Sequence, residues 1–395
     1  MKTADRLESL EMSKIRMLSA KVFELQAQGR EMYMFTLGQP DFPTPKYICE
    51  ACKKAIDEGY TTYPDYSGTP AFRQAVCDKY ERENGLKFDP IQVISTCGAA
   101  QAAYLVLTSF INDGDEVLIP DPMYGIYKNI TTICGGTPVA YSLKEENDFQ
   151  IDLEQMKNLI TDKTKMIVLC SPNNPIGGVL TKENLEGLSR LVEDKDLIIC
   201  SDEIYERLTY DGFEPVSPAS IPSLRDKTII INGFSKAFSM TGWRVGYVIT
   251  PIQYQEKLYI HAGFQISGIP AFVLEAATVA LNDESKYNSV ETMRRAFEKR
   301  RDYMVAEINK TKHFSCKVPK GAFYIFMNIT KTGFTSEECV DWLLENYGIA
   351  MVNGAIFGNE GEGFLRISYA ASMDSIKKAC ALLHKADADL TAAGK

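Results

Sequence analysis

Short apolar runs alternate with amphipathic segments through the middle of this chain. Four of these runs are continuously apolar, and they cover residues 116–120, 165–171, 197–202 and 227–235. Continuous runs of this length are typical of strands that are covered by helices on both faces. Because helical segments separate the runs, we predict right-handed β–α–β units in a mainly parallel sheet.

The chain on either side of these runs has a different pattern. We predict amphipathic helices over residues 9–29 and 46–58, and a charged helix over roughly residues 286–310. The segments "FYIFMNI" (323–329) and "GFLRISYA" (363–370) follow the last helix and are typical of strands. The end of the chain therefore indicates an α+β arrangement rather than further β–α–β units.

At 395 residues the chain is longer than one compact core requires, so two domains are expected. We predict a large α/β domain over residues 46–290, with a mainly parallel sheet covered by helices. Residues 1–45 and 291–395 are predicted to form a smaller α+β domain from both ends of the chain.

Composition and charge exclude some classes of partner. The net charge of −9 gives no electrostatic reason to bind nucleic acid or an anionic membrane. No apolar run is long enough to span a bilayer, and the charged N-terminal segment does not resemble a signal peptide. The ten cysteines are scattered, as expected for reduced thiols, so we predict a cytoplasmic protein.

One cysteine pair, Cys49 and Cys52, has the C-x-x-C spacing of a zinc half-site or a redox couple. No second pair or nearby histidine completes a zinc site, and no β–α–β pattern precedes the pair. We therefore interpret these residues as small apolar positions on one helix face and predict no metal site.

Polar side chains follow each of the four apolar runs. In chain order these side chains are Tyr124, then Asn173 and Asn174, then Asp202 and Tyr205, then Ser235, Lys236 and Arg244. Ligand sites in parallel α/β sheets lie beyond the carboxyl ends of the strands. We therefore expect an aromatic ring, an amide, a carboxylate and a primary amine to meet at one edge of the sheet.

This combination suits pyridoxal 5′-phosphate, a planar and phosphorylated pyridine aldehyde. The Lys236 amine can form a Schiff base with the aldehyde. A carboxylate such as that of Asp202 keeps the ring nitrogen protonated, because ion pairing favours the charged pyridinium. A tyrosine hydroxyl and an asparagine amide can bond the phenolate oxygen, and an aromatic face can stack on the ring.

The phosphate of this cofactor needs backbone N–H groups at a helix N-terminus and a bidentate cation. The segment "STCGAAQAAYLVL" (95–107) predicts the helix, because Gly98, Ala99 and Ala100 let the backbone approach and an apolar helical pattern follows. Arg244 and the Ser235 hydroxyl complete the predicted phosphate site.

With these motifs in this order, the chain resembles the class I and II aminotransferases of the fold-type I pyridoxal-phosphate family. It is most similar to the branch with aspartate and aromatic aminotransferases. The resemblance extends from "FTLGQPDFPTP" to "GFLRISYA" and is most specific in "SKAFSMTGWRVGY", with strong support from "SPNNPIGGV" and "SDEIYERLTY".

The resemblance implies roles for residues at matching positions. Lys236 would bind the cofactor and later move the proton between substrate Cα and cofactor C4′. Asn174 and Tyr205 would bond the phenolic oxygen, while Tyr124 would stack on the ring. Arg366 in "FLRISYA" would grip the substrate α-carboxylate, with Asn174 and Gly38 also on the substrate side.

Tyr63 matches a tyrosine that reaches the phosphate of the neighbouring subunit in this family. The resemblance therefore implies a homodimer that shares its active sites.

Taken singly, each assignment has a structural alternative: Asp202 could cap a helix, Arg366 could belong to a strand ion pair, and Tyr124 could be a core residue. The three histidines fall outside every motif, so we assign them no catalytic role.

Three positions depart from the family pattern. Gly233 stands where many members have a phosphate-binding hydroxyl, and Asn353 stands where a proline is common. Ala100 stands where some aspartate-specific relatives have a lysine, which leaves aromatic, alanine-type or broad specificity open. By family habit, we expect glutamate and 2-oxoglutarate to be one donor and acceptor pair.

The expected activity is ping-pong amino transfer between an L-amino acid and a 2-oxo acid. A carbon–sulfur β-lyase with the same fold is an alternative, since the motifs serve either outcome. A regulatory protein that binds the cofactor without catalysis is a more remote alternative.

Overall fold

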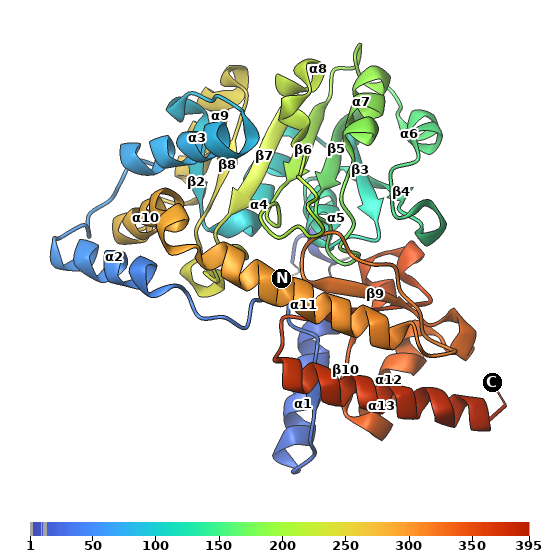
Figure 1. Ribbon diagram of the computed structural model, residues 1–395. Coiled ribbons are helices and arrows are strands. Elements are labelled where there is room, and N and C mark those ends of the chain that lie inside the picture. Colours follow the sequence, from blue (N-terminus) through green and yellow to red (C-terminus); the bar gives the residue numbers. More distant parts are fainter. Residues whose placement is uncertain (1–2, 9, 11–13, 395) are drawn as a thin grey trace.

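The computed structural model describes residues 3–8, 10 and 14–394. Seven strands form its main sheet in the order β2-β8-β7-β6-β5-β3-β4 (Figure 1). The strands are β2 (Val93–Thr96), β3 (Glu116–Asp121), β4 (Thr137–Ser142), β5 (Thr164–Cys170), β6 (Ile198–Asp202), β7 (Thr228–Gly233) and β8 (Gly246–Ile249). Strands β7, β6, β5, β3 and β4 are parallel, whereas β8 runs antiparallel to both of its neighbours. The predicted mainly parallel sheet is confirmed, and β8 makes it mixed.

Helices cover both faces of this sheet, which explains the continuously apolar runs. On β7, Ile229 and Ile231 face the core under α4, α5 and α9, while Ile230 faces the core under α3 and α10. The helices of the large domain are α2 (Lys46–Asp57), α3 (Pro70–Asn84), α4 (Gly98–Phe110), α5 (Ile126–Ile133), α6 (Leu153–Leu159), α7 (Lys182–Leu191), α8 (Pro222–Arg225), α9 (Ile252–Gln265) and α10 (Ala271–Tyr287). Both faces of these strands are covered, so their side chains are mostly apolar until the strand ends.

The smaller domain combines both ends of the chain. Its strands β11 (Val352–Asn353), β12 (Phe364–Ser368) and β9 (Tyr324–Asn328) form an antiparallel sheet in that order, and β1 (Tyr33–Met34) pairs in parallel with β10 (Ile349–Ala350). Its helices are α1 (Lys14–Ala27), α11 (Ser289–Ile308), α12 (Ser336–Tyr347) and α13 (Met373–Ala392). The predicted α+β domain is confirmed, whereas the domain boundaries proposed from the sequence stay a prediction.

Two predicted helix boundaries need correction. The first helix is α1, which ends at Ala27, and predicted positions 9 and 11–13 lie outside the described residues. The charged helix begins at Ser289, because Asn288 adopts a left-handed conformation (φ 52°) that ends α10.

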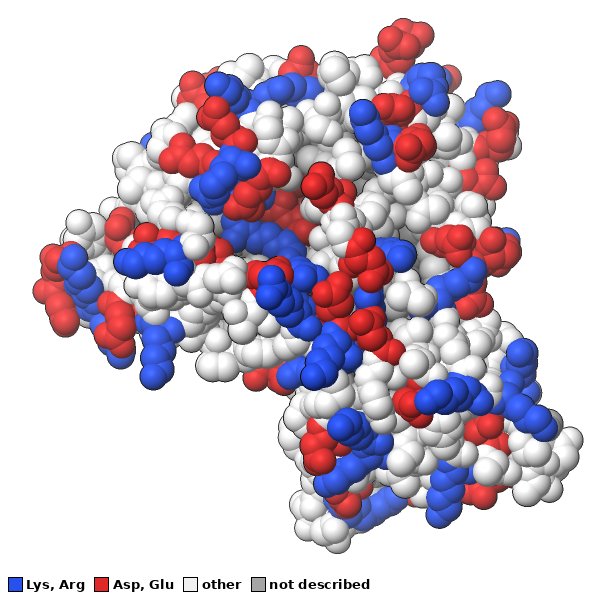
Figure 2. Space-filling model, viewed as in Figure 1, with Lys and Arg blue, Asp and Glu red and all other residues white. Residues whose placement is uncertain are grey.

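Charges of both signs are interspersed on the face shown in Figure 2, including along α11, so this face offers no large patch of one sign. Within the described residues, no helix has both the length and the apolar character needed to cross a bilayer. Cys49 and Cys52 both lie half-buried on α2, as the sequence indicated, and both are free thiols.

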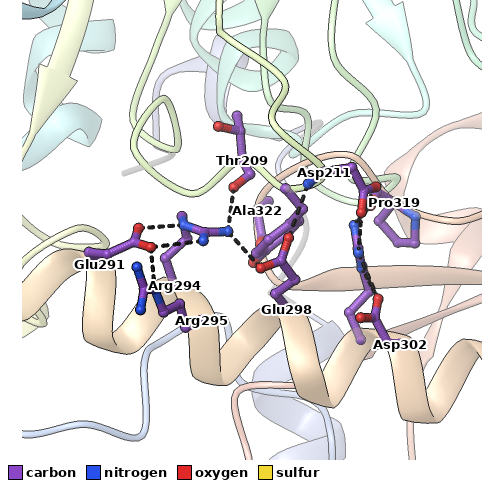
Figure 3. A network of polar contacts seen from close by, with 11 residues as sticks. Thr209, Asp211, Glu291, Arg294, Arg295, Glu298, Asp302, Pro319 and Ala322 are labelled. Carbon is purple, nitrogen blue, oxygen red and sulfur yellow. Dashed lines mark hydrogen bonds and ion pairs between the residues drawn. The ribbon is translucent and has the colours of Figure 1, made fainter.

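Helix α11 runs between the main sheet and α13, and an ion pair and hydrogen bonds join it to the loop that follows β6 (Figures 1 and 3). Arg301 is 2% exposed and donates to both oxygens of Asp211, at 2.8 and 3.0 Å. It also donates to the Pro319 carbonyl at 3.0 Å, and its guanidinium lies 4.8 Å from the Tyr210 ring centroid. One buried side chain therefore joins α11 to the loop that follows β6 and to the segment that precedes β9.

Replacing Arg301 by methionine is expected to lower the free energy of unfolding by about 2 kcal/mol, because hydrogen bonds of a charged donor are lost and the Pro319 carbonyl is left unpaired. The Arg301 hydrogen bond lowers the pKa of Asp211 to about 2. The pairing of Arg301 with the ionised Asp211 stabilises the folded protein above the usual carboxylate pKa. This stabilisation is lost as the pH falls toward 2. Urea titrations at pH 7 and pH 3 should therefore show a smaller difference between the proteins at pH 3.

The matched control is Arg295→Met on the same helix. Arg295 is mostly exposed and pairs with Glu291 on the same helix, so its loss should cost less than about 0.5 kcal/mol. Equal effects of the two substitutions would contradict this account of Arg301.

Candidate active site

A cavity of about 370 Å³ lies at the carboxyl ends of β3, β5, β6 and β7. Its lining includes these residues predicted from the sequence: Gly38, Ala99, Ala100, Tyr124, Asn174, Asp202, Tyr205, Ser235, Lys236, Arg244 and Arg366. It also includes residues that were not predicted, namely Thr36, Leu37, Met123, Ile126, Tyr127, Cys170, Ile204 and Tyr324. Three residues named from the sequence lie outside the lining, namely Gly98, Asn173 and Tyr63.

Lys236 follows β7 and points its amine into this cavity. Its Nζ donates to the Gly38 carbonyl at 2.6 Å and lies 5.8 Å from the centroid of the Tyr205 ring. Burial, aided by the positive charges of Arg366 and Arg244, lowers the pKa of Lys236 to about 8, although Asp202 opposes the shift. The amine is therefore more often unprotonated near neutral pH than an ordinary lysine, as a nucleophile or a base requires.

Asp202 is the last residue of β6, and two donors hold its carboxylate. The Tyr127 hydroxyl donates to Oδ2 at 2.7 Å, and the Ile204 N–H donates to Oδ1 at 3.2 Å. Burial raises the pKa of Asp202, while both hydrogen bonds and the charge of Lys236 act in the opposite direction. Tyr127 was not predicted from the sequence. Its position three residues after the predicted Tyr124, on the first turn of α5, was a signal that could have identified it.

Arg366 lies in the middle of β12 and is 2% exposed. Its Nη1 donates to Asn174 Oδ1 at 3.1 Å, its Nη2 donates to the Thr36 carbonyl at 2.6 Å, and its Nε has no hydrogen-bond partner among the described residues. No carboxylate of the described chain pairs with it, and burial lowers its pKa. The sequence alternative of an ordinary strand ion pair is therefore wrong.

Tyr324 on β9 lines the cavity and lies beside two of the predicted residues, Tyr205 and Arg366. Its hydroxyl lies 2.8 Å from that of Tyr205, and the Arg366 guanidinium lies 4.7 Å from its ring centroid. A Cβ added at Gly38 would lie 2.7 Å from the Tyr324 hydroxyl, so only glycine leaves this approach open. The sequence placed Tyr324 in a strand and gave no reason to select it.

At the other end of the cavity, Arg244 covers the first turn of α4. Its Nη2 donates to the Cys97 carbonyl at 3.2 Å, and its Nη1 donates to the Thr241 carbonyl at 2.8 Å. Gly98 has φ +74°, and a Cβ there would lie 2.6 Å from Arg244 Nη2. The guanidinium and the N-terminus of the helix therefore face the same space, which favours an anion.

Two departures from the family pattern have local explanations. Gly233 pairs with Gly246 across β7 and β8, and an added Cβ would lie 3.0 Å from the Gly246 Cα. A side chain there would press against the neighbouring strand, so the close approach of these two strands favours glycine. Asn353 accepts a hydrogen bond from the Ala355 N–H at 2.8 Å, so it caps the short helix η7 (Gly354–Phe357).

Two predicted aromatic residues are accessible. Tyr124 is 50% exposed, and its N–H donates to the Asn174 carbonyl at 3.1 Å, which links the segments after β3 and β5. The interpretation of Tyr124 as a core residue is therefore wrong. Tyr63 is 87% exposed and lies away from the cavity of its own chain.

Together, the fold and the cavity define an α/β enzyme. Its site contains an amine, a carboxylate and a guanidinium and lies at the carboxyl ends of the parallel strands. The family model "Aminotransferase class I and II" matches residues 30–383. Over 98% of both chains, the protein is 39% identical to aromatic-amino-acid aminotransferase 2 of Thermococcus litoralis and 38% identical to an aspartate aminotransferase of Pyrococcus abyssi. The crystal structure of an aromatic aminotransferase from Pyrococcus horikoshii superimposes with a TM-score of 0.88 at 36% identity, covering 93% of this chain and 100% of that one.

The chain therefore belongs to the class I and II aminotransferase family, whose members depend on pyridoxal phosphate. It is an aminotransferase, with amino acids and 2-oxo acids as its classes of substrate.

Proposed function

We propose that this aminotransferase uses pyridoxal 5′-phosphate in the described cavity, with glutamate and 2-oxoglutarate as one substrate pair. The two half-reactions would follow a ping-pong order, in which the first oxo acid leaves before the second substrate binds. The observation that carries the proposal is that Lys236 and Arg366 share one cavity while neither is ion-paired with a carboxylate of the described chain. An amine with a lowered pKa suits an aldehyde, and a buried guanidinium suits a carboxylate.

The phosphate end of the cofactor fits the space under Arg244. The first N–H groups of a helix have no partner within the helix, and residues 98–100 supply such groups at the start of α4. The absence of room for a Cβ at Gly98 shows how closely the guanidinium approaches this turn. Ser235 is buried beside the same cavity and would supply a hydroxyl donor.

The ring end of the cofactor fits the residues that follow β5 and β6. Asp202 would form an ion pair with a protonated ring nitrogen, while Asn174 and Tyr205 would form hydrogen bonds with the phenolic oxygen. Tyr124 has an exposed ring in the cavity wall and would lie against the cofactor. Because Tyr127 donates to Oδ2 of Asp202, it would fix the orientation of that carboxylate.

Pyridoxal phosphate, when bound, supplies an aldehyde that captures an amino group and a ring that withdraws electrons from the substrate Cα. Lys236 would take the proton from Cα, since its lowered pKa leaves part of the amine unprotonated at neutral pH. Arg366 and Asn174 would hold the α-carboxylate and so fix the position of Cα.

The second substrate pair is proposed to have an apolar or aromatic side chain. Lys236, Arg244 and Arg366 are the cations among the lining residues, and each has another role in this proposal. Ala100 offers no charge to a distal carboxylate, whereas Leu37, Met123 and Ile126 supply apolar surface. The name of the Thermococcus relative, an aromatic-amino-acid aminotransferase, agrees with this preference.

We also propose a homodimer in which Tyr63 reaches the phosphate of the partner subunit. Tyr63, Tyr66, Ile260 and Phe264 are exposed aromatic or aliphatic side chains, and Tyr66 packs against α9, which carries Ile260 and Phe264. Such a patch marks an interaction site. Mixing inactive Tyr63→Ala and Lys236→Ala proteins should restore activity through hybrid dimers, and a failure to restore it with dimers present would contradict shared sites. The cytoplasmic location stays a prediction.

The function is tested by adding single L-amino acids to the cofactor-loaded protein and following its absorbance. Glutamate and aromatic amino acids should convert the aldehyde form to the amine form, and 2-oxoglutarate should reverse the change. Cystathionine distinguishes the β-lyase alternative, which would release pyruvate and ammonia without an oxo acid acceptor. Pyruvate release in place of amino transfer would overturn the proposal.

A further inference from the structure

Asp121, the last residue of β3, contacts the smaller domain although it does not line the cavity. It is 7% exposed, and its two oxygens accept hydrogen bonds from the N–H groups of Asn359 (2.9 Å) and Glu360 (3.1 Å). No ion pair with a cation of the described chain accompanies them. A buried carboxylate is thus held by two amides at the start of the short helix η8 (Asn359–Gly361).

Both segments that meet at Asp121 have features that favour this contact. Gly358 has φ +140°, a conformation that other residues rarely adopt, and a Cβ there would collide with Asp121 Oδ1. Nearby, the Met123 N–H donates to the Phe357 carbonyl at 2.8 Å, and the Ser142 hydroxyl donates to Glu360 at 2.7 Å. The carboxyl ends of β3 and β4 are therefore fastened to residues 357–360 of the smaller domain.

Residues 357–360 also form part of the surroundings of Arg366. The Arg366 guanidinium lies 5.0 Å from the ring centroid of Phe357. The same segment lies in the connection from β11 to β12. Asn353 of β11 pairs with Leu365 of β12, and Leu365 is the neighbour of Arg366. A displacement of this segment would therefore move both the Phe357 ring and the strand that presents the guanidinium.

We propose that Asp121 is a positioning residue for substrate binding: by clasping the amides of Asn359 and Glu360 it holds Phe357 and Arg366 against the large domain. This contact is called the Asp121 clasp below. The inference rests on the proposed function in one respect, namely that Arg366 binds the substrate carboxylate. The clasp itself is a feature of the protein without substrate.

The test variant is Asp121→Asn, which keeps the shape of the side chain. An amide has one oxygen, so one of the two N–H groups would face the new NH₂ group instead of an acceptor. Hydrogen exchange of a peptide covering residues 354–363, without substrate, should become about tenfold faster. The KM for the amino acid should rise about tenfold while kcat stays within about twofold of wild type, as expected for lost binding that is uniform between ground state and transition state.

The control is Asp387→Asn. Asp387 also accepts two backbone N–H groups, those of Lys312 and His313 at 3.0 and 2.9 Å, and it additionally lies 2.7 Å from the His313 ring nitrogen, but it joins two parts of the smaller domain. Its loss should lower thermal stability and leave both KM and exchange at residues 354–363 unchanged. Ser142→Ala is a milder second variant, expected to raise KM about two- to threefold, so the test does not depend on Asp121→Asn folding.

Two results would overturn the clasp: unchanged exchange at residues 354–363 in Asp121→Asn, or a KM effect that Asp387→Asn reproduces. A wild-type protein without amino transfer would instead refute the proposed function. In that case the exchange measurement alone would decide whether Asp121 clasps the segment.

Discussion

Replacing Lys236 by alanine is expected to reduce the rate of amino transfer by about 10⁴-fold or more, because the nucleophile and the base for the Cα proton are lost together. Its amine lies in the cavity with a pKa of about 8. Single-turnover absorbance with glutamate would measure this loss directly. Lys236→Arg should be equally inactive, since a guanidinium keeps the charge but stays protonated.

The control for Lys236 is Lys54→Ala. Lys54 is an exposed lysine of α2 in a long contact with Glu58, so its replacement should leave the rate unchanged. A Lys236→Ala protein that transfers amino groups at the wild-type rate would refute the catalytic assignment. Circular dichroism of both variants would show that any loss is not due to unfolding.

Replacing Arg366 by methionine is expected to lower kcat/KM for amino acids by about 10²–10⁴-fold, as for the loss of one partner of a buried charged pair. The guanidinium is almost fully buried. Among the described residues its Nε has no partner, and Asn174 is the one side chain that accepts a hydrogen bond from it. An incoming α-carboxylate would supply the missing acceptor. Steady-state kinetics with glutamate would measure the loss.

An amine that lacks the carboxylate provides the internal control for Arg366. Its slow reaction with the wild-type protein should be changed little by Arg366→Met, so the preference for carboxylated substrates should collapse. Arg300→Met is the matched variant, because Arg300 is also largely buried but pairs bidentately with Asp41. If Arg300→Met lowered kcat/KM as much as Arg366→Met, the assignment of the α-carboxylate site would be wrong.

The parts of the fold that were predictable from sequence are those with a strong local signal. Strands β3, β5, β6 and β7 are buried on both faces, so their apolar runs are continuous. Strand β4 is a half-exposed edge strand that contains Pro138, which masks its pattern. Strands β2 and β8 have four residues each, and no local pattern distinguishes the antiparallel direction of β8.

The candidate site was predictable where side chains follow a strand end, as Asn174, Asp202 and Lys236 do. Tyr324 was not, because it comes from a strand of the other domain and meets Tyr205 only after the two domains pack. The carbonyls of Thr36 and Gly38 were not either, since every residue has a carbonyl and only tertiary structure selects these two.

The pairing of the two ends of the chain has a consequence during synthesis. Arg366 donates to the Thr36 carbonyl, 330 residues away along the chain, and β1 pairs with β10. At about 5–20 residues per second, a ribosome needs about 15–65 s to make the intervening chain. The main sheet can form during that interval, whereas β1 has no partner until translation has passed β10. The smaller domain can therefore be completed only after β10 has been made, so its two halves meet later than the strands of the main sheet.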